Sequence, residues 1–159
     1  MSEYALNPGQ PAPDVEAEAW PGGRLRLVDL RGRWVALYFY PKDNTPGCTN
    51  EAKDFRDAAA DFEALDAVIL GVSRDSIASH QRFAEKHELP FQLLSDPDET
   101  LCQAFDVIRM KNMYGRQVRG IERSTFLIDP EGVVRHAWRK VRVKGHVAEV
   151  LEKLRELRG

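Results

Sequence analysis

The cysteine at position 48 is the residue whose surroundings most clearly suggest chemistry. It lies in the segment PKDNTPGCT, which leads from a continuously apolar stretch, Trp34 to Tyr40, into a sequence with helical periodicity. Two prolines and a glycine mark residues 41–47 as a loop, so the thiol is expected in the first turn of a helix. There, free backbone N–H groups and the helix dipole favour the thiolate, the nucleophilic form of cysteine.

A helix terminus alone does not make a thiol fully nucleophilic at neutral pH. Lowering a thiol pKa from about 8.5 to about 6 requires roughly 3.4 kcal/mol, whereas a helix terminus typically supplies about 0.3 to 1 kcal/mol and at most about 2. A neighbouring cation shifts a carboxyl pKa by about 1 to 3 units, so a buried arginine could supply the remainder for a thiol. The sequence must therefore bring an arginine to Cys48.

Thr45 stands three residues before Cys48, where a thioredoxin-type oxidoreductase has its second cysteine. Its hydroxyl cannot form a disulfide, but it can donate a hydrogen bond to a substrate oxygen or to the thiolate. A threonine at this position therefore favours peroxide activation over thiol-disulfide exchange. A catalytically silent interaction module stays open as an alternative, because fold does not fix function.

Strands and helices alternate in the pattern of apolar residues around this loop. The third helix has an N-cap, a first-position proline and a capping-box acid in Asp96, Pro97 and Glu99, whereas residues 108–122 show neither periodicity and are predicted to form a long loop. Strands are predicted at residues 15–20, 24–28, 34–40, 67–72, 91–94, 124–128 and 133–138, and helices at residues 48–62, 76–87, 96–105 and 147–157.

These elements predict an α/β fold. The 159 residues suit one domain, so residues 1–159 are expected to form a single unit. Its centre should be a mixed β-sheet with helices on both faces, preceded by an N-terminal β-hairpin that turns at residues 21–23.

Charge is distributed unevenly along the chain. The net charge is -2, but residues 1–106 carry 10 Lys and Arg against 19 Asp and Glu, while residues 107–159 carry 13 against 6. The overall acidity argues against a nucleic-acid partner, so the basic half is interpreted as a solvated face. Alternatively, its cations fold back over an anionic site formed by the acidic half.

Other composition features exclude several classes of protein. The longest apolar run is too short to span a membrane and no secretory leader is evident, so a cytoplasmic location is expected. Two cysteines without a CxxC motif do not suggest a disulfide framework. No cofactor is needed to explain stability in a chain of this composition. No metal site is expected either, because the four histidines lack metal-binding spacing; they lie at His80, His87, His136 and His146, the last interpreted as a surface residue.

The pattern PxxxTxxC, formed by Pro41, Thr45 and Cys48, resembles the peroxidatic motif of the peroxiredoxins. The stretch WVALYFYPKDNTPGCTNEAKDF is similar in particular to the bacterioferritin comigratory protein, or peroxiredoxin Q, subfamily. The resemblance continues through LLSDPDETLCQAF, IERSTFLIDPEGVVRHAWRKV and VKGHVAEVL, so it covers nearly the whole chain.

The resemblance implies a thioredoxin-like fold and reduction of hydroperoxides without metal or haem. It also implies roles for four residues. Pro41 would shield the cysteine from solvent, Thr45 would orient the peroxide, and Cys48 would attack it to give a sulfenic acid and water or an alcohol. The arginine of the family falls on Arg123, within IERSTF, which would stabilise the thiolate and the developing charge.

The sequence departs from the family at the resolving cysteine. In many relatives it lies five residues after the peroxidatic cysteine, where this chain has Lys53, and in others on the next helix, where it has Phe83 and Ala84. Cys102 is interpreted as a small buried hydrophobe. A one-cysteine cycle completed by an external thiol is therefore predicted, with a disulfide between Cys48 and Cys102, reduced by thioredoxin, as the alternative.

The expected partners are a hydroperoxide substrate and a reducing thiol, which could be thioredoxin, glutaredoxin or glutathione. No nucleic acid or membrane partner is expected, and the family includes both monomers and homodimers. Met110, Met113 and Tyr114 could line an approach for an organic hydroperoxide or a docking surface for a reductant. They could equally cover the edge of the sheet.

Overall fold

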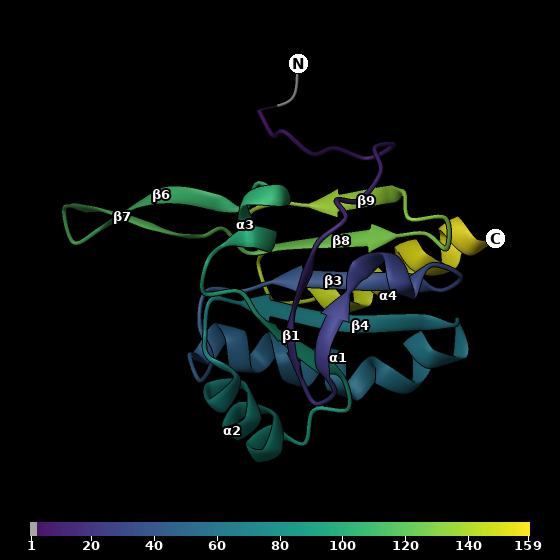
Figure 1. The fold of residues 1–159 in the computed structure, drawn as a ribbon, viewed down its shortest axis with the longest axis horizontal. Helices are drawn as coiled ribbons and strands as arrows, with labels where there is room; N and C mark the ends of the chain where they lie inside the picture. The colour runs from purple at the N-terminus through teal and green to yellow at the C-terminus, as the bar shows by residue number, and fades with distance from the viewer. Residues whose placement is uncertain (1–2) are drawn as a thin grey trace.

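A computed structural model describes residues 3–159 as an α/β fold (Figure 1). The strands are β1 (Glu16–Trp20), β2 (Gly23–Arg26), β3 (Trp34–Phe39), β4 (Ala67–Ser73), β5 (Gln92–Ser95), β6 (Ile108–Met113), β7 (Arg116–Ile121), β8 (Ser124–Ile128) and β9 (Val134–Trp138). The helices are α1 (Pro46–Ala64), α2 (Ile77–His87), α3 (Thr100–Ala104) and α4 (His146–Arg158), with a short 3-10 helix η1 (Leu27–Leu30).

Seven strands form a mixed sheet in the order β2-β1-β5-β4-β3-β8-β9. β3 pairs in parallel with β4, and β4 with β5, whereas the remaining neighbours are antiparallel. All six residues of β3 are buried, as its continuous apolar sequence predicts for a strand covered on both faces. The predicted mixed sheet and N-terminal hairpin are confirmed.

Alternate residues of β3 contribute to two separate hydrophobic cores. Ala36 and Tyr38 pack on one face with residues of α1, α2 and α4, and this core contains Cys48. Leu37 and Phe39 pack on the other face with residues of η1 and α3, and this core contains Cys102. Helices therefore cover both faces, as predicted, and the two cysteines lie on opposite sides of the sheet.

The prediction of a long loop at residues 108–122 was wrong. β6 and β7 form an antiparallel hairpin that projects from the body of the molecule (Figure 1). Its turn is Tyr114-Gly115, with φ of 52° and 78°, the positive values that a two-residue hairpin turn requires. Most of the hairpin is exposed, so neither face needs the alternating apolar residues by which a strand is recognised.

The predicted start of the third helix was also wrong, because α3 begins only at Thr100. Asp96 caps it from a distance, accepting hydrogen bonds from the backbone N–H groups of Leu101 (3.1 Å) and Cys102 (2.8 Å). Glu99 has a left-handed φ of 62°, which interrupts the helix. Its carboxylate binds two arginines instead of closing a capping box.

His146 is not a surface residue as the sequence suggested. It is buried at the first position of α4, and its Nε2 atom lies 2.8 Å from the hydroxyl oxygen of Thr125. Burial lowers the pKa of His146 to about 4, so the ring is neutral at pH 7. No helix within residues 3–159 is both long and apolar enough to cross a bilayer.

Candidate active site

The loop between β3 and α1 places Cys48 in the first turn of α1. Thr45 is the N-cap residue, with an extended backbone, and Pro46 follows as the first helical residue, where its missing N–H is not needed. Cys48 is only 1% exposed. The thiol therefore sits beneath the surface, close to the positive end of the α1 dipole.

Arg123 reaches this thiol from the segment between β7 and β8. One guanidinium nitrogen, Nη2, lies 3.4 Å from the sulfur of Cys48, and Nη1 donates a 2.7 Å hydrogen bond to Glu51. Burial opposes the charge of Arg123, but Glu51 and Cys48 outweigh it, so the pKa of Arg123 is raised. A cation from the basic half of the chain thus lies beside the candidate nucleophile.

Glu51 lies among the polar positions of α1, where an acidic side chain is normally expected on a solvent-facing side of the helix. It is nevertheless fully buried. Burial raises the pKa of Glu51 to about 7, although Arg123 opposes the shift. The signal was present in the spacing, because a residue three positions after Cys48 lies on the same side of the helix.

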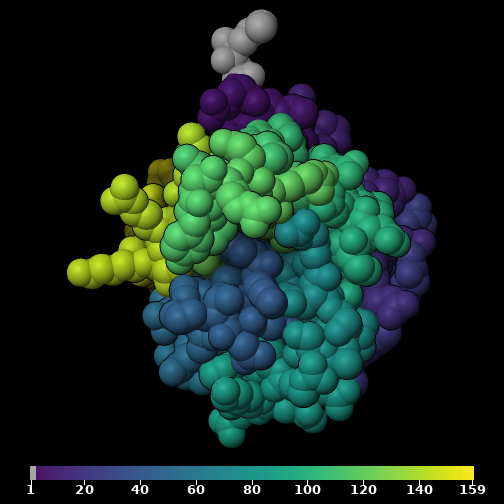
Figure 2. Space-filling view, turned by 90° about the vertical axis from the view of Figure 1, so that its left-hand side faces the viewer, coloured from purple at the N-terminus to yellow at the C-terminus, as the bar shows by residue number. Residues whose placement is uncertain are grey.

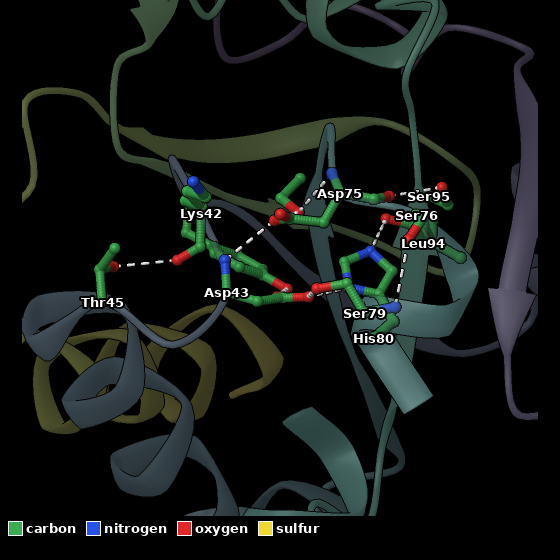
Figure 3. Close-up of polar contacts among 11 residues, drawn as sticks. Lys42, Asp43, Thr45, Asp75, Ser76, Ser79, His80, Leu94 and Ser95 are labelled. Carbon is green, nitrogen blue, oxygen red and sulfur yellow. Dashed lines mark hydrogen bonds and ion pairs between the residues drawn. The ribbon is translucent and has the colours of Figure 1, made fainter. Parts of the chain in front are cut away.

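Thr45 and Pro41 remain within the loop. The hydroxyl of Thr45 donates a 2.9 Å hydrogen bond to the carbonyl of Lys42 (Figure 3). Since a hydroxyl has one proton, this bond leaves Thr45 as an acceptor toward a substrate rather than the expected donor. Pro41 is half-buried directly after Tyr40, at the end of β3.

A buried carboxylate that the sequence analysis missed anchors the same loop. Asp43 is 4% exposed, and one of its oxygens accepts a 2.6 Å hydrogen bond from the hydroxyl of Tyr40. Its other oxygen accepts a 2.7 Å bond from Ser79 and lies 2.8 Å from Nδ1 of His80 (Figure 3). Burial raises the pKa of Asp43, but its hydrogen-bond partners, His80 foremost, outweigh burial and lower it.

His80 extends this network to the sheet. Its Nε2 lies 2.9 Å from the carbonyl of Leu94 in β5, and a carbonyl only accepts hydrogen bonds, so Nε2 carries a proton. The backbone N–H of Asp43 donates to Asp75 at 2.9 Å. The loop is thus bound to α2 and β5. The sequence signal was a histidine at an apolar-periodic position of α2, beside Ile77 and Phe83.

Cys102 has a different environment. It is fully buried, and burial, followed by a hydrogen bond from the thiol to Asp96, raises the pKa of Cys102 well above its usual range. No cluster of three or more His, Cys, Asp or Glu side chains suited to a metal ion occurs in residues 3–159.

The sequence and the fold both match one protein family. A model of the AhpC/TSA family matches residues 8–137. The chain belongs to the AhpC/TSA family of peroxiredoxins. This peroxiredoxin is 54% identical over 149 residues to peroxiredoxin Bcp of Bacillus subtilis, covering 94% of the chain and 95% of the relative. It is 59% identical over 134 residues to peroxiredoxin Bcp of Xanthomonas campestris, covering 84% of each chain.

Solved structures agree with this assignment. A structure of the Xanthomonas campestris bacterioferritin comigratory protein has a TM-score of 0.89 and 49% identity, covering 94% of the peroxiredoxin and 98% of that chain. A PrxQ variant of Xylella fastidiosa has a TM-score of 0.92 and 44% identity, and the match covers 97% of the peroxiredoxin and 98% of that chain. The thioredoxin-like fold and the peroxiredoxin Q subfamily are confirmed. The peroxiredoxin is accordingly a thiol-dependent peroxidase.

Proposed function

We propose that Cys48 is the peroxidatic residue and that it reduces hydrogen peroxide and organic hydroperoxides in a one-cysteine cycle. The observation that carries this proposal is the 3.4 Å approach of Arg123 to a thiol in the first turn of α1. The guanidinium and the helix N-terminus both lie at the same sulfur, and each stabilises negative charge that develops there. A solved relative from Xanthomonas campestris is described by its alkyl peroxide reduction activity, which supports organic hydroperoxides as substrates.

In the first step the thiolate of Cys48 attacks the terminal oxygen of the hydroperoxide. The S–O bond forms as the O–O bond breaks, which gives a sulfenic acid and an alkoxide or hydroxide that takes up a proton. Arg123 stabilises the charge that moves onto the leaving oxygen. Thr45 accepts a hydrogen bond from the O–H group of the peroxide and so orients it. Pro41 shields the thiol from water.

In the remaining steps an external thiol restores the enzyme. One thiol condenses with the sulfenic acid to form a mixed disulfide and water, and a second thiol releases Cys48 and leaves as a disulfide. A disulfide within the chain would need Cα atoms about 5.5 Å apart, whereas Cys102 packs in the core on the other face of the sheet. Thioredoxin, glutaredoxin and glutathione are the candidate reductants.

The intact mass of the reduced protein after one equivalent of hydrogen peroxide tests this cycle, with modified residues located by peptide mapping. We expect one added oxygen on Cys48 in the wild type, and no peroxide consumption by Cys48→Ser. Loss of two hydrogens, mapped to a link between Cys48 and Cys102, would overturn the one-cysteine cycle. An unmodified Cys48 would overturn its role as the nucleophile, and turnover that survives in Cys48→Ser would do the same.

A further inference from the structure

The β6-β7 hairpin concentrates the exposed apolar surface of the molecule. Within residues 3–159, the large hydrophobic side chains that are exposed are Met110 (58%), Met113 (48%), Tyr114 (98%) and Val118 (41%), and all four lie on this hairpin. Single exposed apolar residues are common, but a cluster on one projecting element is typical of an interaction surface. Their exposure also excludes the alternative that the two methionines and Tyr114 cover the sheet edge.

The same hairpin carries an excess of positive charge, although Arg109 and Arg119 are paired with the carboxylates of Asp106 and Glu99. Residues 108–121 contain Arg109, Lys111, Arg116 and Arg119 and no acidic residue. Arg116 is exposed beside the turn that carries Tyr114. A partner that buries this surface must therefore combine apolar with acidic groups. Two copies of the hairpin would bring like charges together, which disfavours a second copy of the chain as the partner in a hairpin-to-hairpin contact.

The base of the hairpin is adjacent to the candidate active site. β7 ends at Ile121, two residues before Arg123, and Lys111 of β6 donates a 2.5 Å hydrogen bond to the carbonyl of Ile121. Burial lowers the pKa of Lys111, repulsion by Arg123 lowers it further, and the interaction with Cys48 opposes the shift. Figure 2 shows the green hairpin directly above the blue surface formed around the start of α1.

Ion pairs hold the base of the hairpin in place. Glu99 accepts hydrogen bonds from Arg119 of β7 and, at 3.0 Å, from Arg74 after β4. Arg109 of β6 binds Asp106 at 2.8 Å. Among the strands of residues 3–159, β6 and β7 pair only with each other, so each also presents an unpaired outer edge. A hairpin fixed in this way loses little conformational entropy when a partner binds.

We propose that the β6-β7 hairpin is the docking site for a protein reductant whose contact face is apolar and acidic. The proposal rests on the one-cysteine cycle, in which an external thiol must reach Cys48. Because Cys48 is 1% exposed, a reductant has to remain bound while the thiol becomes accessible. An apolar, cationic hairpin at the edge of the site holds an acidic protein there, whereas a small thiol needs no such contact.

Steady-state kinetics with two reductants test this proposal. Thioredoxin, regenerated by its reductase and NADPH, is the protein probe, and dithiothreitol is the small one. We compare Tyr114→Asn, which removes the ring and keeps a residue suited to positive φ, with Arg116→Glu. Arg158→Glu makes the same charge change at the end of α4, on the opposite side of the molecule from the hairpin (Figure 1).

We expect Tyr114→Asn and Arg116→Glu each to raise the KM for thioredoxin about five- to thirtyfold, the range for loss of an interface anchor. Rates with dithiothreitol should stay within about twofold of wild type, and Arg158→Glu should change neither. An unchanged KM, or wild-type turnover no faster with thioredoxin than with dithiothreitol, would overturn the docking proposal. Wild-type protein inactive with both reductants would instead contradict the peroxidase cycle, so the two failures are distinguishable.

Discussion

Cys48 and Cys102 pack on opposite faces of the central sheet. Cys48 belongs to the core formed with α1, α2 and α4, and Cys102 to the core formed with α3 and η1. For the two sulfurs to meet, one of them would have to leave its core and pass the edge of the sheet. Even if the first turn of α1 opened and exposed Cys48, Cys102 would stay packed in the other core with α3 and η1.

Replacement of Cys102 should therefore affect stability more than catalysis. We expect Cys102→Ala to keep peroxidase turnover within about twofold of wild type and to lose about 1 kcal/mol of unfolding free energy from the small cavity. Turnover with dithiothreitol and urea denaturation measure the two quantities, with Cys48→Ser as the inactive control. A large loss of turnover in a folded Cys102→Ala protein would make Cys102 a participant in the cycle.

Gly47 tests the placement of Arg123. A Cβ atom at this position would lie 3.2 Å from Nη2 of Arg123, which is held between Cys48 and Glu51. Gly47→Ala should displace the guanidinium by a few tenths of an ångström and slow the reaction of Cys48 with peroxide. The rate should fall by less than about tenfold, because a misplacement of about 1 Å costs about a hundredfold. Because alanine is the better helix former, the unfolding free energy should not fall by more than about 0.5 kcal/mol.

Stopped-flow measurement of the second-order rate with hydrogen peroxide checks this expectation. Ala58→Gly, at a half-buried position of the same helix, is the control that changes helix propensity away from Arg123. It should lower stability while leaving the peroxide rate unchanged. A Gly47→Ala rate equal to wild type would mean that the position of Arg123 tolerates displacement.

The sequence predicted the elements whose burial is one-sided or complete, and it missed those whose environment is set by distant neighbours. The prediction of β3 was correct because a fully buried strand is apolar at every position. The hairpin of β6 and β7 was missed because its stability comes from a turn at Tyr114 and from ion pairs at its base. Neither the turn nor the ion pairs produce a periodic pattern of apolar residues in the sequence.

The candidate site shows the same division. Cys48 and Thr45 could be found because one loop carries both, and Arg123 was reached only through a family resemblance. Glu51 and Asp43 were missed because polar residues are normally assigned to the surface, and their burial depends on Arg123 and His80, which lie far away in the sequence.

Glu51 and His146 should make opposing contributions to the pH dependence of stability. The pKa of Glu51 rises from 4.5 to about 7 on folding, so the folded state holds the extra proton and stability falls as pH rises between these values. The pKa of His146 falls from 6.5 to about 4, so the unfolded state holds the extra proton and stability is lost as pH falls through that window. Between about pH 4.5 and 6.5 the two effects should largely cancel.

Single substitutions should expose each contribution. Relative to wild type, Glu51→Gln should gain unfolding free energy as pH rises from 4.5 to 7.5, by at most roughly 3 kcal/mol. His146→Gln should gain unfolding free energy relative to wild type as pH falls from 7.5 to 4.5, by a similar amount. Urea denaturation at pH 4.5, 5.5, 6.5 and 7.5 measures both. Difference curves that stay flat with pH would show that neither group shifts its pKa on folding.

The pair of Asp43 and His80 should determine how firmly the loop that carries Cys48 is held. Asp43→Ala removes the acceptor for buried Tyr40 and His80 and for half-buried Ser79, and should cost about 3 to 5 kcal/mol of unfolding free energy. Loosening the loop should also slow the reaction of Cys48 with peroxide. The effect on rate follows from position, because Asp43 lies five residues before the thiol.

Asp43→Asn is the matched variant. Its side-chain oxygen can still accept a hydrogen bond from Tyr40, and its amide can donate to Nδ1 of a neutral His80 whose Nε2 proton stays on the carbonyl of Leu94. It should therefore recover most of the stability and of the peroxide rate that Asp43→Ala loses. If both variants reacted with peroxide at the wild-type rate while only Asp43→Ala lost stability, the pair would support the fold without positioning Cys48.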